Sequence, residues 1–398
     1  MTTARKKIAL CLEYPLALRG GVSVLVEILL SGLKERYDLV LVSPDTAETL
    51  AQSTAAPAVS AHLPWDAGKA TRASAQTLAR QLAQNGVQLA HFHLGGNYGF
   101  GNRFPGYCPI VHLSRLGIPS VSTVHLVVSL LDGYCGPQKP LWFKLALLPI
   151  AWTAKMQVLA HVRREIAVSH HDERKLQRWY WPLRAKYMQM YHSRLSAKSR
   201  PPANPTHEPV ILNVGHIARR KGQAVLAEAF AQIAPRHPEW KLHLVGDDLD
   251  KTETDRIKEI ARSHALGERI LFLGRRDDAM NLMSKAGIYA QPSFDEALGL
   301  ALQEAMFCGC PSIGSNAGGI PELIEHQKTG LLVEPGNATQ LAQALESYIA
   351  DSSLREKYGR EGAASIAQKG MTAEKMLEKH VELYEGILGK HRTLNIER

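Results

Sequence analysis

Short apolar stretches alternate with amphipathic segments along most of this chain. In the first half, apolar runs of strand length lie at residues 6–13, 38–43, 87–93, 119–125 and 165–169. In the second half, similar runs lie at residues 210–214, 241–245, 270–273, 288–291 and 312–314. The segment 22–36 follows the first of these runs and has a helical pattern. Because strands that alternate with helices are typical of parallel sheets, the pattern predicts an α/β fold in both halves.

A Pro-rich, polar segment at 196–209 separates the two halves and suits an interdomain linker. A length of 398 residues is comfortable for two domains. We therefore expect a first Rossmann-like domain at 1–203 and a second at 204–372. The final segment, 373–387, has apolar residues at helical spacing and predicts an amphipathic helix.

Charge is distributed unevenly between the halves. Residues 1–200 contain 24 Lys and Arg against 11 Asp and Glu, whereas residues 201–398 contain 23 against 27. The basic first half is suited to an anionic membrane surface, a phosphorylated acceptor or a nucleic acid. Because no helix-turn-helix, zinc or RNA-recognition signature is present, we expect no nucleic-acid partner.

Several features favour a cytoplasmic protein. The sequence has no run of about 18 apolar residues, so we expect no transmembrane helix. Its first residues lead directly into a strand, without the apolar region of a signal peptide. Five irregularly spaced cysteines suit a reducing compartment. We interpret Cys308 and Cys310 as small buried residues, because no second Cys or His cluster accompanies them as metal ligands.

The segment 287–306 changes from a strand pattern to a helical pattern, and Gly299 lies at the change. A helix that starts there directs unpaired N–H groups and the positive end of its dipole outward, which suits an anion. Glu304 lies four residues after Leu300, on the same helical face, and Glu296 lies in the preceding loop. A diphosphate at the helix start and two carboxylates for hydroxyl groups are what a nucleotide-sugar site requires.

The same region carries a long motif. It comprises Glu296-x7-Glu304, Ala305-Met306-x-x-Gly309-x-Pro311, Gly318-Gly319-Ile320-Pro321-Glu322 and Thr329-Gly330-Leu331-Leu332-Val333-Glu334-Pro335-Gly336. From Gln291 to Gly336 the chain resembles the family 4 glycosyltransferases. This resemblance implies a retaining enzyme without metal or cofactor. It also implies the GT-B fold: two Rossmann-like domains that face each other across a cleft, with residues 373–398 crossing back to complete the first domain.

The resemblance gives roles to residues of the second domain. It implies that Glu304 binds the ribose hydroxyls of the donor. It also implies that Glu296 and the backbone of Gly299 and Leu300 bind the sugar and phosphate. Ala297 and Leu298 belong to the same donor-binding segment.

A cationic turn begins the second domain after its first strand. Arg219, Arg220 and Lys221 precede a helix start and form an anion site for a diphosphate. Lys221 fits the family motif G-R-L-x-x-x-K-G, whereas His216 replaces its Arg. Either Arg219 or Arg220 takes over that role, or donor affinity is weaker or more sensitive to pH.

The next two strands of the second domain also end in candidate donor residues. Gly246 follows one strand, and Gly274 and Arg275 follow the other, where we expect the nucleotide base. Asp248-x-Asp250 matches the metal-binding D-x-D motif of the other large glycosyltransferase fold. Such short acidic matches arise readily by chance in polar loops, and we expect no metal.

The first domain has its own candidates. Gly20 and Gly21 open the first helix, where the family has a Gly-Gly pair near the donor phosphate. His125 ends a strand and resembles the family T-x-H motif, whose His lies by the transferring sugar; Leu126 stands where the family often has Asp. His91 and His93 resemble the family H-x-H motif, and we interpret them as structural or close to the acceptor.

The segment 126–152 is apolar and aromatic, but Lys144 and Pro149 interrupt it. Its apolar stretches are too short to span a bilayer and suit a helix that lies on a membrane surface. Basic and aromatic residues follow, including Arg163, Arg164 and the run 174–181. Ordinary core helices are the alternative interpretation. Surface contact predicts a protein peripheral to the inner face of the cytoplasmic membrane.

Together these features predict a hexosyltransferase that uses a nucleotide-diphosphate sugar and retains configuration. Its acceptor would be a saccharide or lipid-linked hydroxyl in bacterial lipopolysaccharide, capsule or glycolipid synthesis. We assign catalytic roles to His125, Lys221 and Glu296. The alternatives are a nucleotide-sugar epimerase of the same architecture and a non-catalytic nucleotide-sugar-binding protein. The sequence does not favour a phosphorylase, because it has no signature of a cofactor-bearing lysine. It does not favour an NAD-dependent oxidoreductase, because it has no G-x-G-x-x-G motif.

Overall fold

A computed structural model describes residues 5–16, 20–102, 104–127, 129–136, 138–196 and 207–396 of this chain. The chain divides into two compact units. The first contains the residues up to Arg194 together with the segment from Ala373 onward, and the second is Leu195–Thr372. Most of the expected linker, at 197–206, and the expected boundary at 203/204 lie outside the described residues.

The described part of the first unit has a seven-stranded parallel sheet in the order β3-β2-β1-β4-β5-β6-β7. Its strands are β1 Lys6–Leu12, β2 Tyr37–Ser43, β3 Val59–Pro64, β4 Leu89–Leu94, β5 Ser120–Val124, β6 Arg164–Ala167 and β7 Tyr187–Gln189. Each strand that the sequence predicts in this half is confirmed, with small shifts at its ends. The edge strands β3 and β7 lie outside the predicted runs.

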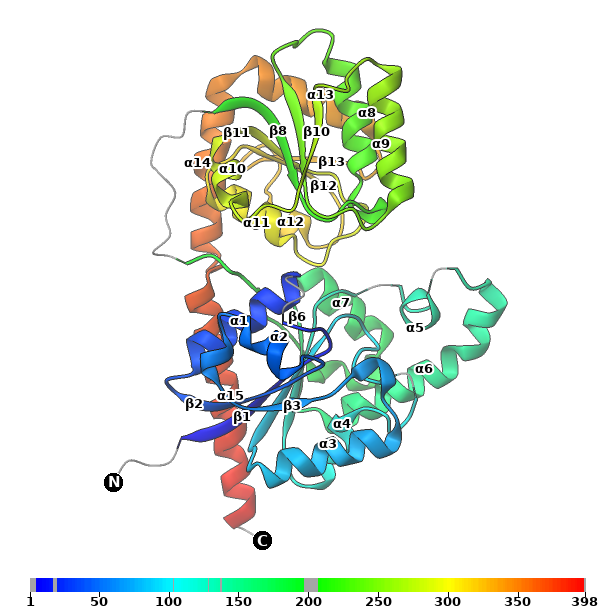
Figure 1. Ribbon diagram of the computed structural model, residues 1–398, viewed down its shortest axis with the longest axis vertical. Coiled ribbons are helices and arrows are strands. Elements are labelled where there is room, and N and C mark those ends of the chain that lie inside the picture. Colours follow the sequence, from blue (N-terminus) through cyan, green and yellow to red (C-terminus); the bar gives the residue numbers. More distant parts are fainter. Residues whose placement is uncertain are drawn as a thin grey trace. The chain divides into compact units, whose positions relative to one another are not determined.

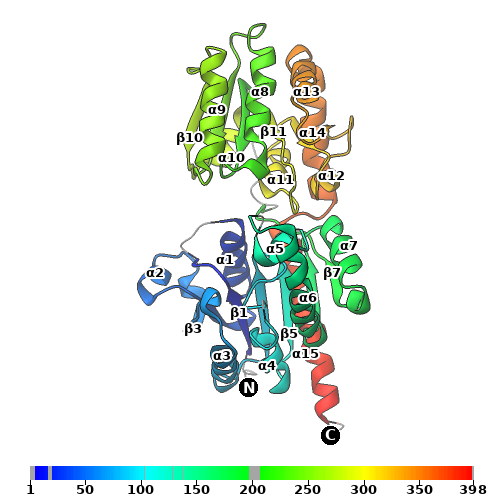
Figure 2. The ribbon, with the colours of Figure 1, turned by 90° about the vertical axis from the view of Figure 1, so that its right-hand side faces the viewer.

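Helices cover both faces of this sheet (Figure 1 and Figure 2). They are α1 Gly21–Leu33, α2 Ala47–Ala51, α3 Arg72–Gln84, α4 Pro109–Arg115, α5 Asp132–Cys135, α6 Leu141–His161, α7 His170–Trp179 and α15 Ala373–Ile396. The short 3-10 helices are Ala56–Ala58, Ala67–Lys69 and Trp181–Lys186. Helix α4 packs against α3 and α6, whereas α1 contacts α15. The helix predicted at the chain end is therefore present and belongs to the first unit.

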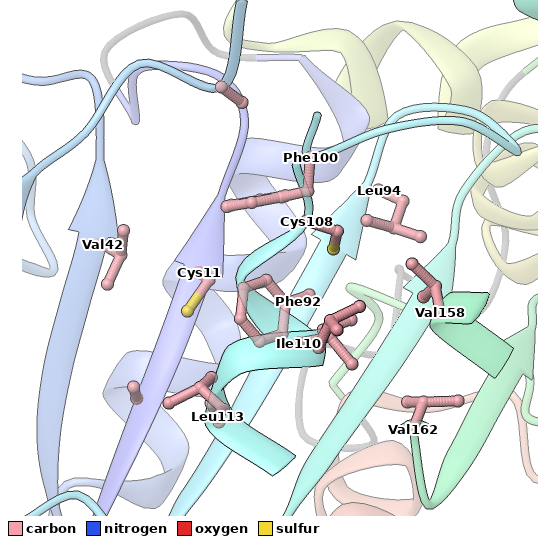
Figure 3. Packing of buried hydrophobic residues seen from close by; sticks show 14 of the residues in the cluster. Cys11, Val42, Phe92, Leu94, Phe100, Cys108, Ile110, Leu113, Val158 and Val162 are labelled. Atoms are coloured by element: carbon pink, nitrogen blue, oxygen red, sulfur yellow. The ribbon is translucent and has the colours of Figure 1, made fainter. Parts of the chain in front are cut away.

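Alternation along β4 decides which side chains enter each face of the sheet. Phe92 packs with Ile110 and Leu113 of α4 in the large apolar core of this unit (Figure 3). Because successive side chains of a strand point to opposite faces, His91 and His93 lie on the other face. That face receives α15.

Helix α15 is attached to the sheet by both apolar and polar contacts. Leu383 and Ile387 of α15 pack against Val121 of β5 and Ile166 of β6. Near the edge, Glu385 accepts a hydrogen bond from the Tyr37 hydroxyl at 2.8 Å and also binds Lys6. These contacts make the end of the chain part of the first unit's core.

The second unit is smaller and follows the same plan. Its described residues form a six-stranded parallel sheet in the order β10-β9-β8-β11-β12-β13. The strands are β8 Glu208–Val214, β9 Lys241–Val245, β10 Ile270–Gly274, β11 Ala286–Gln291, β12 Ser312–Ser315 and β13 Leu331–Val333. The sequence predicts all of these except β13, which is again an edge strand.

Helices also lie on both faces of the second sheet (Figure 1). They are α8 Gln223–Ile233, α9 Lys251–Ser263, α10 Ala279–Lys285, α11 Leu300–Phe307, α12 Ile320–Leu323, α13 Ala338–Ala350 and α14 Ser352–Gln368, with a 3-10 turn at Arg219–Lys221. Helix α8 packs against α9 and α13, and α11 packs against α10 and α14. Two parallel-sheet, Rossmann-like units in one chain confirm the predicted GT-B architecture.

Candidate active site

The central strands of the second sheet supply two loops that meet. Strands β8 and β11 are neighbours, and the strands that follow them lie on opposite sides of this pair. This is a topological switch point, and open α/β sheets bind ligands at the carboxyl ends of the strands beside such a point. The loop after β8 carries Lys221, and the loop after β11 carries Glu296.

Close backbone contact holds these loops together. Gly222 has a φ of +69°, and a Cβ on it would lie 2.1 Å from the carbonyl oxygen of Pro292, so any side chain there would clash. Beside this contact, the Phe294 N–H donates to the Arg220 carbonyl at 2.8 Å. The positions of the cationic turn and the Glu296 loop therefore depend on each other.

Glu296 lies at the centre of a polar cluster. Its carboxylate oxygen Oε2 lies 2.5 Å from Lys221 Nζ and 3.6 Å from Arg220 Nη1. Gln291 Nε2 and the Ser293 hydroxyl donate to the same oxygen at 3.2 Å and 3.4 Å. Burial opposes ionisation, but the nearby charges of Lys221 and Arg220 and these hydrogen bonds outweigh it, so the pKa of Glu296 is lowered. Glu296 is therefore a buried anion at neutral pH.

Arg220 and Lys221 are both cations that remain partly accessible. The side chain of Arg220 is 38% exposed and that of Lys221 is 18% exposed, against 10% for Glu296. The guanidinium of Arg220 also donates to the Asp295 carbonyl at 2.6 Å. One shared carboxylate thus faces two positive charges, which leaves the cluster with net positive charge toward an anionic ligand.

Two helices begin at this cluster, and each has a glycine at its N-cap. Helix α8 follows Gly222, and α11 follows Gly299, which has a φ of +97°; neither glycine can supply a side-chain cap. In contrast, helices α2, α3 and α7 are capped by Thr46, Thr71 and Ser169. In α8 the Ala224 N–H donates to the Glu253 carboxylate at 3.1 Å, whereas no side chain of the described residues caps the start of α11. The start of α11 is therefore the helix end that favours an anion.

The Gly318-Gly319 pair packs closely against the backbone of the loop that leads into α11. A Cβ on Gly318 would lie 2.0 Å from the Glu296 carbonyl oxygen, and the Gly319 N–H donates to that oxygen at 2.8 Å. Ala297, Leu298 and Gly299 are buried, and Leu300 is half-buried. This close packing is the physical reason for two glycines at this point of the motif.

Glu304 lies one turn into α11 and is fully buried. Its charge contributes, after burial itself, to the raised pKa of the Tyr289 phenol on β11. The structure therefore places Glu304 in the interior of the second unit, close to Tyr289 of β11.

The remaining donor-side candidates follow β8, β9 and β10. The Gly246 N–H donates to the Gly274 carbonyl at 2.8 Å, and Arg275 is exposed beside it. His216 Nδ1 lies 3.7 Å from Asp247 Oδ2, with both side chains nearly half exposed. The backbone N–H of Arg219 donates to Asp250 at 3.3 Å.

Asp248 and Asp250 have local structural partners. Asp250 accepts from the Glu253 N–H at 3.2 Å and caps α9, and Asp248 accepts from the Thr254 hydroxyl at 2.8 Å. Their spacing is therefore explained by the start of α9. Cys308 and Cys310 are buried thiols, as the sequence predicts, and burial raises the pKa of both.

In the first unit, the candidate residues lie at the carboxyl ends of β1, β4 and β5. Gly20 precedes α1, Gly21 is its first residue, and α1 has no side-chain cap. The His125 N–H donates to the Leu94 carbonyl at 3.0 Å, and His125 Nε2 lies 3.1 Å from His93 Nδ1. The structure thus brings His125 and His93 together.

These two histidines belong to a larger histidine cluster. It contains His91, His93, His125, His192 and His380, whose rings contact one another at centroid distances of 4.2–5.8 Å. His91 also contacts the Tyr384 hydroxyl at 2.6 Å and the Thr123 hydroxyl at 2.8 Å. Burial, reinforced for most members by neighbouring histidines, lowers the pKa of each imidazole, to about 4 for His380.

Sequence reasoning missed several members of these clusters. Gln291 and Ser293 lie within five residues of Glu296, so their polar character beside a predicted strand end was an available signal. His192 and His380 join the cluster from distant parts of the chain and have no local signal. Glu13, at the end of β1, accepts from the Gly95 N–H at 2.6 Å and from the Phe100 N–H, and so orders the loop after β4.

The first half of α6 has an apolar surface. Leu141, Trp142, Leu145 and Ile150 are 62%, 71%, 51% and 40% exposed, and Trp181, in a short helix that contacts α6, is 69% exposed. Figure 1 shows this half of α6 projecting from its unit together with α5. Among the helices of the described ranges, none combines the length and apolar character needed to span a bilayer.

Comparisons with known proteins match each of the two units to a glycosyltransferase family model. The family model described as Glycosyltransferase Family 4 matches residues 19–189, and that described as Glycosyl transferases group 1 matches residues 196–365. An N-acetyl-alpha-D-glucosaminyl L-malate synthase of Bacillus anthracis is 31% identical over 181 residues, which cover 46% of each chain. A lipopolysaccharide core biosynthesis mannosyltransferase of Rhizobium leguminosarum is 29% identical over 181 residues, 45% of this chain and 51% of that protein. The matches thus span about half the length of these curated relatives.

Solved structures share the fold over nearly the whole chain. A glycosyltransferase from Rickettsia africae has a TM-score of 0.75 at 20% identity and covers 97% of this chain and 99% of its own. Anabaena HepE in complex with UDP-glucose has a TM-score of 0.71 at 18% identity, with coverage of 95% and 99%.

Proposed function

Because this chain belongs to the family 4 glycosyltransferases, we propose that it transfers a hexose from a nucleotide-diphosphate sugar to an acceptor hydroxyl, with retention of configuration. The observation that carries the proposal is the cationic pair Arg220 and Lys221 in contact with Glu296, in the loop that leads to the uncapped start of α11. A diphosphate is the ligand that such a group of donors suits best.

The second unit would hold the donor. Arg220 and Lys221 would bind the diphosphate, and the first amides of α11 would add hydrogen bonds from Gly299 and Leu300 onward. Glu304 would accept from the ribose hydroxyls. Arg219 would add a third cation to the diphosphate site, and Gly246, Gly274 and Arg275 would form the edge of the site where the base binds.

These residues would act mainly by electrostatic stabilisation of the departing diphosphate. When the bond from the anomeric carbon to the diphosphate breaks, its electron pair goes to a diphosphate oxygen. The acceptor oxygen forms the new bond on the same face, and its proton is taken by the departing diphosphate. Preorganised cations and amides at that diphosphate are commonly worth a few kcal/mol of transition-state stabilisation. We expect no metal ion or cofactor in this role.

Glu296 would reduce the net positive charge of the Arg220 and Lys221 cluster. Its carboxylate binds Lys221 before the donor arrives, so Lys221 is already oriented and the buried cluster is partly neutralised. Glu296 would then contribute to catalysis in two ways: it would contact the sugar, and it would hold Lys221 in position. In the first unit, Gly20, Gly21 and His125 would contact the substrates.

Relatives support a nucleotide sugar and a bacterial surface glycan as the substrates. Structures of Anabaena HepE were solved with UDP and with UDP-glucose. Other relatives are named as a lipopolysaccharide core mannosyltransferase and a lipopolysaccharide outer core galactosyltransferase. We therefore propose a saccharide or lipid-linked acceptor in lipopolysaccharide, capsule or glycolipid synthesis.

The apolar surface of α6 suits an acceptor of that kind. Trp142 and Leu145 would enter the interface of an anionic membrane, and exposed Arg178 and Arg184 nearby would bind its head groups. We propose a cytoplasmic protein that attaches to the inner face of the membrane through this surface.

A panel of nucleotide sugars tests the function. Thermal shift identifies the donor that stabilises the protein, and that donor is then incubated with lipid-linked and soluble acceptors while product is followed by mass spectrometry. We expect one donor to stabilise the protein and to be consumed with formation of a glycoside. Conversion of the donor to an isomer without any acceptor would identify an epimerase. Stabilisation without transfer or hydrolysis would identify a binding protein.

A further inference from the structure

His125 has two ring nitrogens with different surroundings. Nε2 lies 3.1 Å from His93 Nδ1, within hydrogen-bonding distance. Nδ1 has no hydrogen-bond partner among the described residues, and His125 is only half-buried. Nδ1 is therefore the nitrogen that His125 can offer to a ligand, because Nε2 is already engaged within the protein.

The hydrogen bond between the two imidazoles needs one N–H and one lone pair. In one arrangement, His125 donates from Nε2, and its Nδ1 is then an acceptor. In the other, His93 donates from Nδ1, and His125 then carries its own proton on Nδ1. The two arrangements present opposite chemistry to a ligand, a lone pair or an N–H.

The surroundings of the other ring nitrogen of His93, Nε2, distinguish the two arrangements. His93 is fully buried, and its Nε2 has no hydrogen-bond partner within the described part of the chain. If His125 were the donor, the proton of neutral His93 would have to lie on this Nε2, as a buried N–H without an acceptor. Orphaned N–H groups are rarer in protein interiors than orphaned acceptors. The surroundings of His93 thus favour a proton on its Nδ1.

The rest of the cluster keeps both rings neutral. His93 packs on His91 at a centroid distance of 4.2 Å, and His125 packs on His192 at 5.2 Å. Burial first, and the neighbouring imidazoles second, lower the pKa of both His93 and His125. A second proton on either ring is therefore disfavoured at neutral pH, and the question is one of tautomer alone.

We propose that His93 is a positioning residue that holds His125 as the neutral Nδ1–H tautomer, so that His125 offers a hydrogen-bond donor to an oxygen atom of the substrate. This inference deepens the proposed transferase function and rests on it for the identity of the substrate. A donor suits a sugar hydroxyl or an oxygen that gains negative charge during transfer, whereas a lone pair at this point would suit removal of a proton.

Nitrogen NMR of protein with ¹⁵N-labelled histidine tests the tautomer without any need for activity. The signals of His125 are assigned by their loss in His125→Asn. We expect a pyrrole-like shift for Nδ1 and a pyridine-like shift for Nε2 at pH 7. A pyridine-like shift for Nδ1 and a pyrrole-like shift for Nε2 would overturn the proposal even if the protein proved to be a transferase. The expected shifts would support the tautomer assignment even if the protein proved to be a binding protein.

Three variants of His93 then test its role in positioning. Asn places an amide N–H near the position of Nδ1, Gln places it nearer the position of Nε2, and Leu removes it. We expect His93→Leu and His93→Gln to lower kcat on the order of 10–100-fold with a smaller change in KM, because misplacement of a reacting contact costs this much. His93→Asn should recover most of this loss. Because Asn and Gln put similar polar groups into the same buried site, equal losses for the two would contradict the proposal even if His93→Leu failed to fold.

Discussion

Lys221 Nζ lies 2.5 Å from Glu296 Oε2, although 75 residues separate them in the sequence. The pair forms because β8 and β11 are neighbours in the sheet, and the loops that follow them meet at the switch point. This cation and this carboxylate, in contact between the starts of α8 and α11, are the centre of the candidate site.

Lys221→Ala should lower turnover on the order of 10²–10³-fold, because it removes a cation from the departing diphosphate. It also leaves the buried Glu296 carboxylate with Arg220 as its remaining cation nearby. Steady-state kinetics with the identified donor measure the effect. Exposed Lys285, at the end of α10, provides the control: Lys285→Ala should have near-normal turnover. Near-normal turnover of Lys221→Ala itself would remove Lys221 from the phosphate site.

Glu304 is the proposed partner of the ribose. A hydrogen bond to a charged group contributes about 1.5–3 kcal/mol, so Glu304→Gln should weaken donor binding by roughly 10–100-fold in calorimetry. Gln keeps the size of this fully buried side chain. If affinity is unchanged while thermal unfolding is normal, the ribose role is wrong.

The histidine cluster should make the first unit sensitive to acid. His380 has a pKa of about 4 in the folded chain because it is buried, against an ordinary value of 6.5. Below pH 6.5 the unfolded chain binds a proton that the folded chain does not, so stability falls as pH drops toward 4. Each such histidine contributes a slope of about 1.4 kcal/mol per pH unit. Replacement of His380 by Leu should reduce the slope by one such contribution.

Fluorescence can follow this unfolding selectively. All tryptophans except Trp240 lie in the first unit, so a Trp240→Phe background reports on that unit alone. Urea titrations at pH 7, 6 and 5 give the stability at each pH. A His380→Leu protein with an unchanged pH slope would contradict the assignment.

A buried ion pair offers a separate test of stability. Lys155 of α6 and Glu165 of β6 lie 2.6 Å apart with no exposed side-chain surface, and the Ser122 hydroxyl donates to Glu165 at 2.8 Å. Loss of one partner leaves an uncompensated buried charge, so Glu165→Leu should destabilise the first unit by about 3–5 kcal/mol. The double variant with Lys155→Met should recover much of this loss. A double variant no more stable than Glu165→Leu would contradict this account.

Membrane contact depends on the exposed side chains of α6. The intact protein should float with anionic vesicles at low salt and less with neutral ones. Replacement of Trp142 and Leu145 by Ser should reduce the floated fraction on the order of tenfold, because these side chains would supply buried apolar area. Leu116→Ser changes a similarly exposed residue at the end of α4 and should have no effect. Equal flotation of all three proteins would exclude this surface.

Much of the fold is readable from local pattern. Central strands such as β4 and β11 are buried along their whole length, so their apolar runs are evident in the sequence. Strands β3, β7 and β13 lie at sheet edges and escape prediction, because β7 and β13 have only three residues each and β3 has no fully buried position. The edge strand β10 is predicted because its sequence Ile270–Leu273 is a continuous apolar run. The Gly299 boundary was also predictable, because the pattern changes there from strand to helix.

Local pattern is enough to predict the α/β class, the central strands, the helix start at Gly299 and the cationic turn before α8, because each depends on residues close together in the chain. The contacts of Lys221 with Glu296, of His93 with His125 and of His380 with the histidine cluster become visible only in the folded chain. These contacts depend on which strands become neighbours and on where the last helix packs, and no local pattern contains that information. The charges and hydrogen bonds that make the two clusters chemically distinctive therefore exist only after the chain has folded.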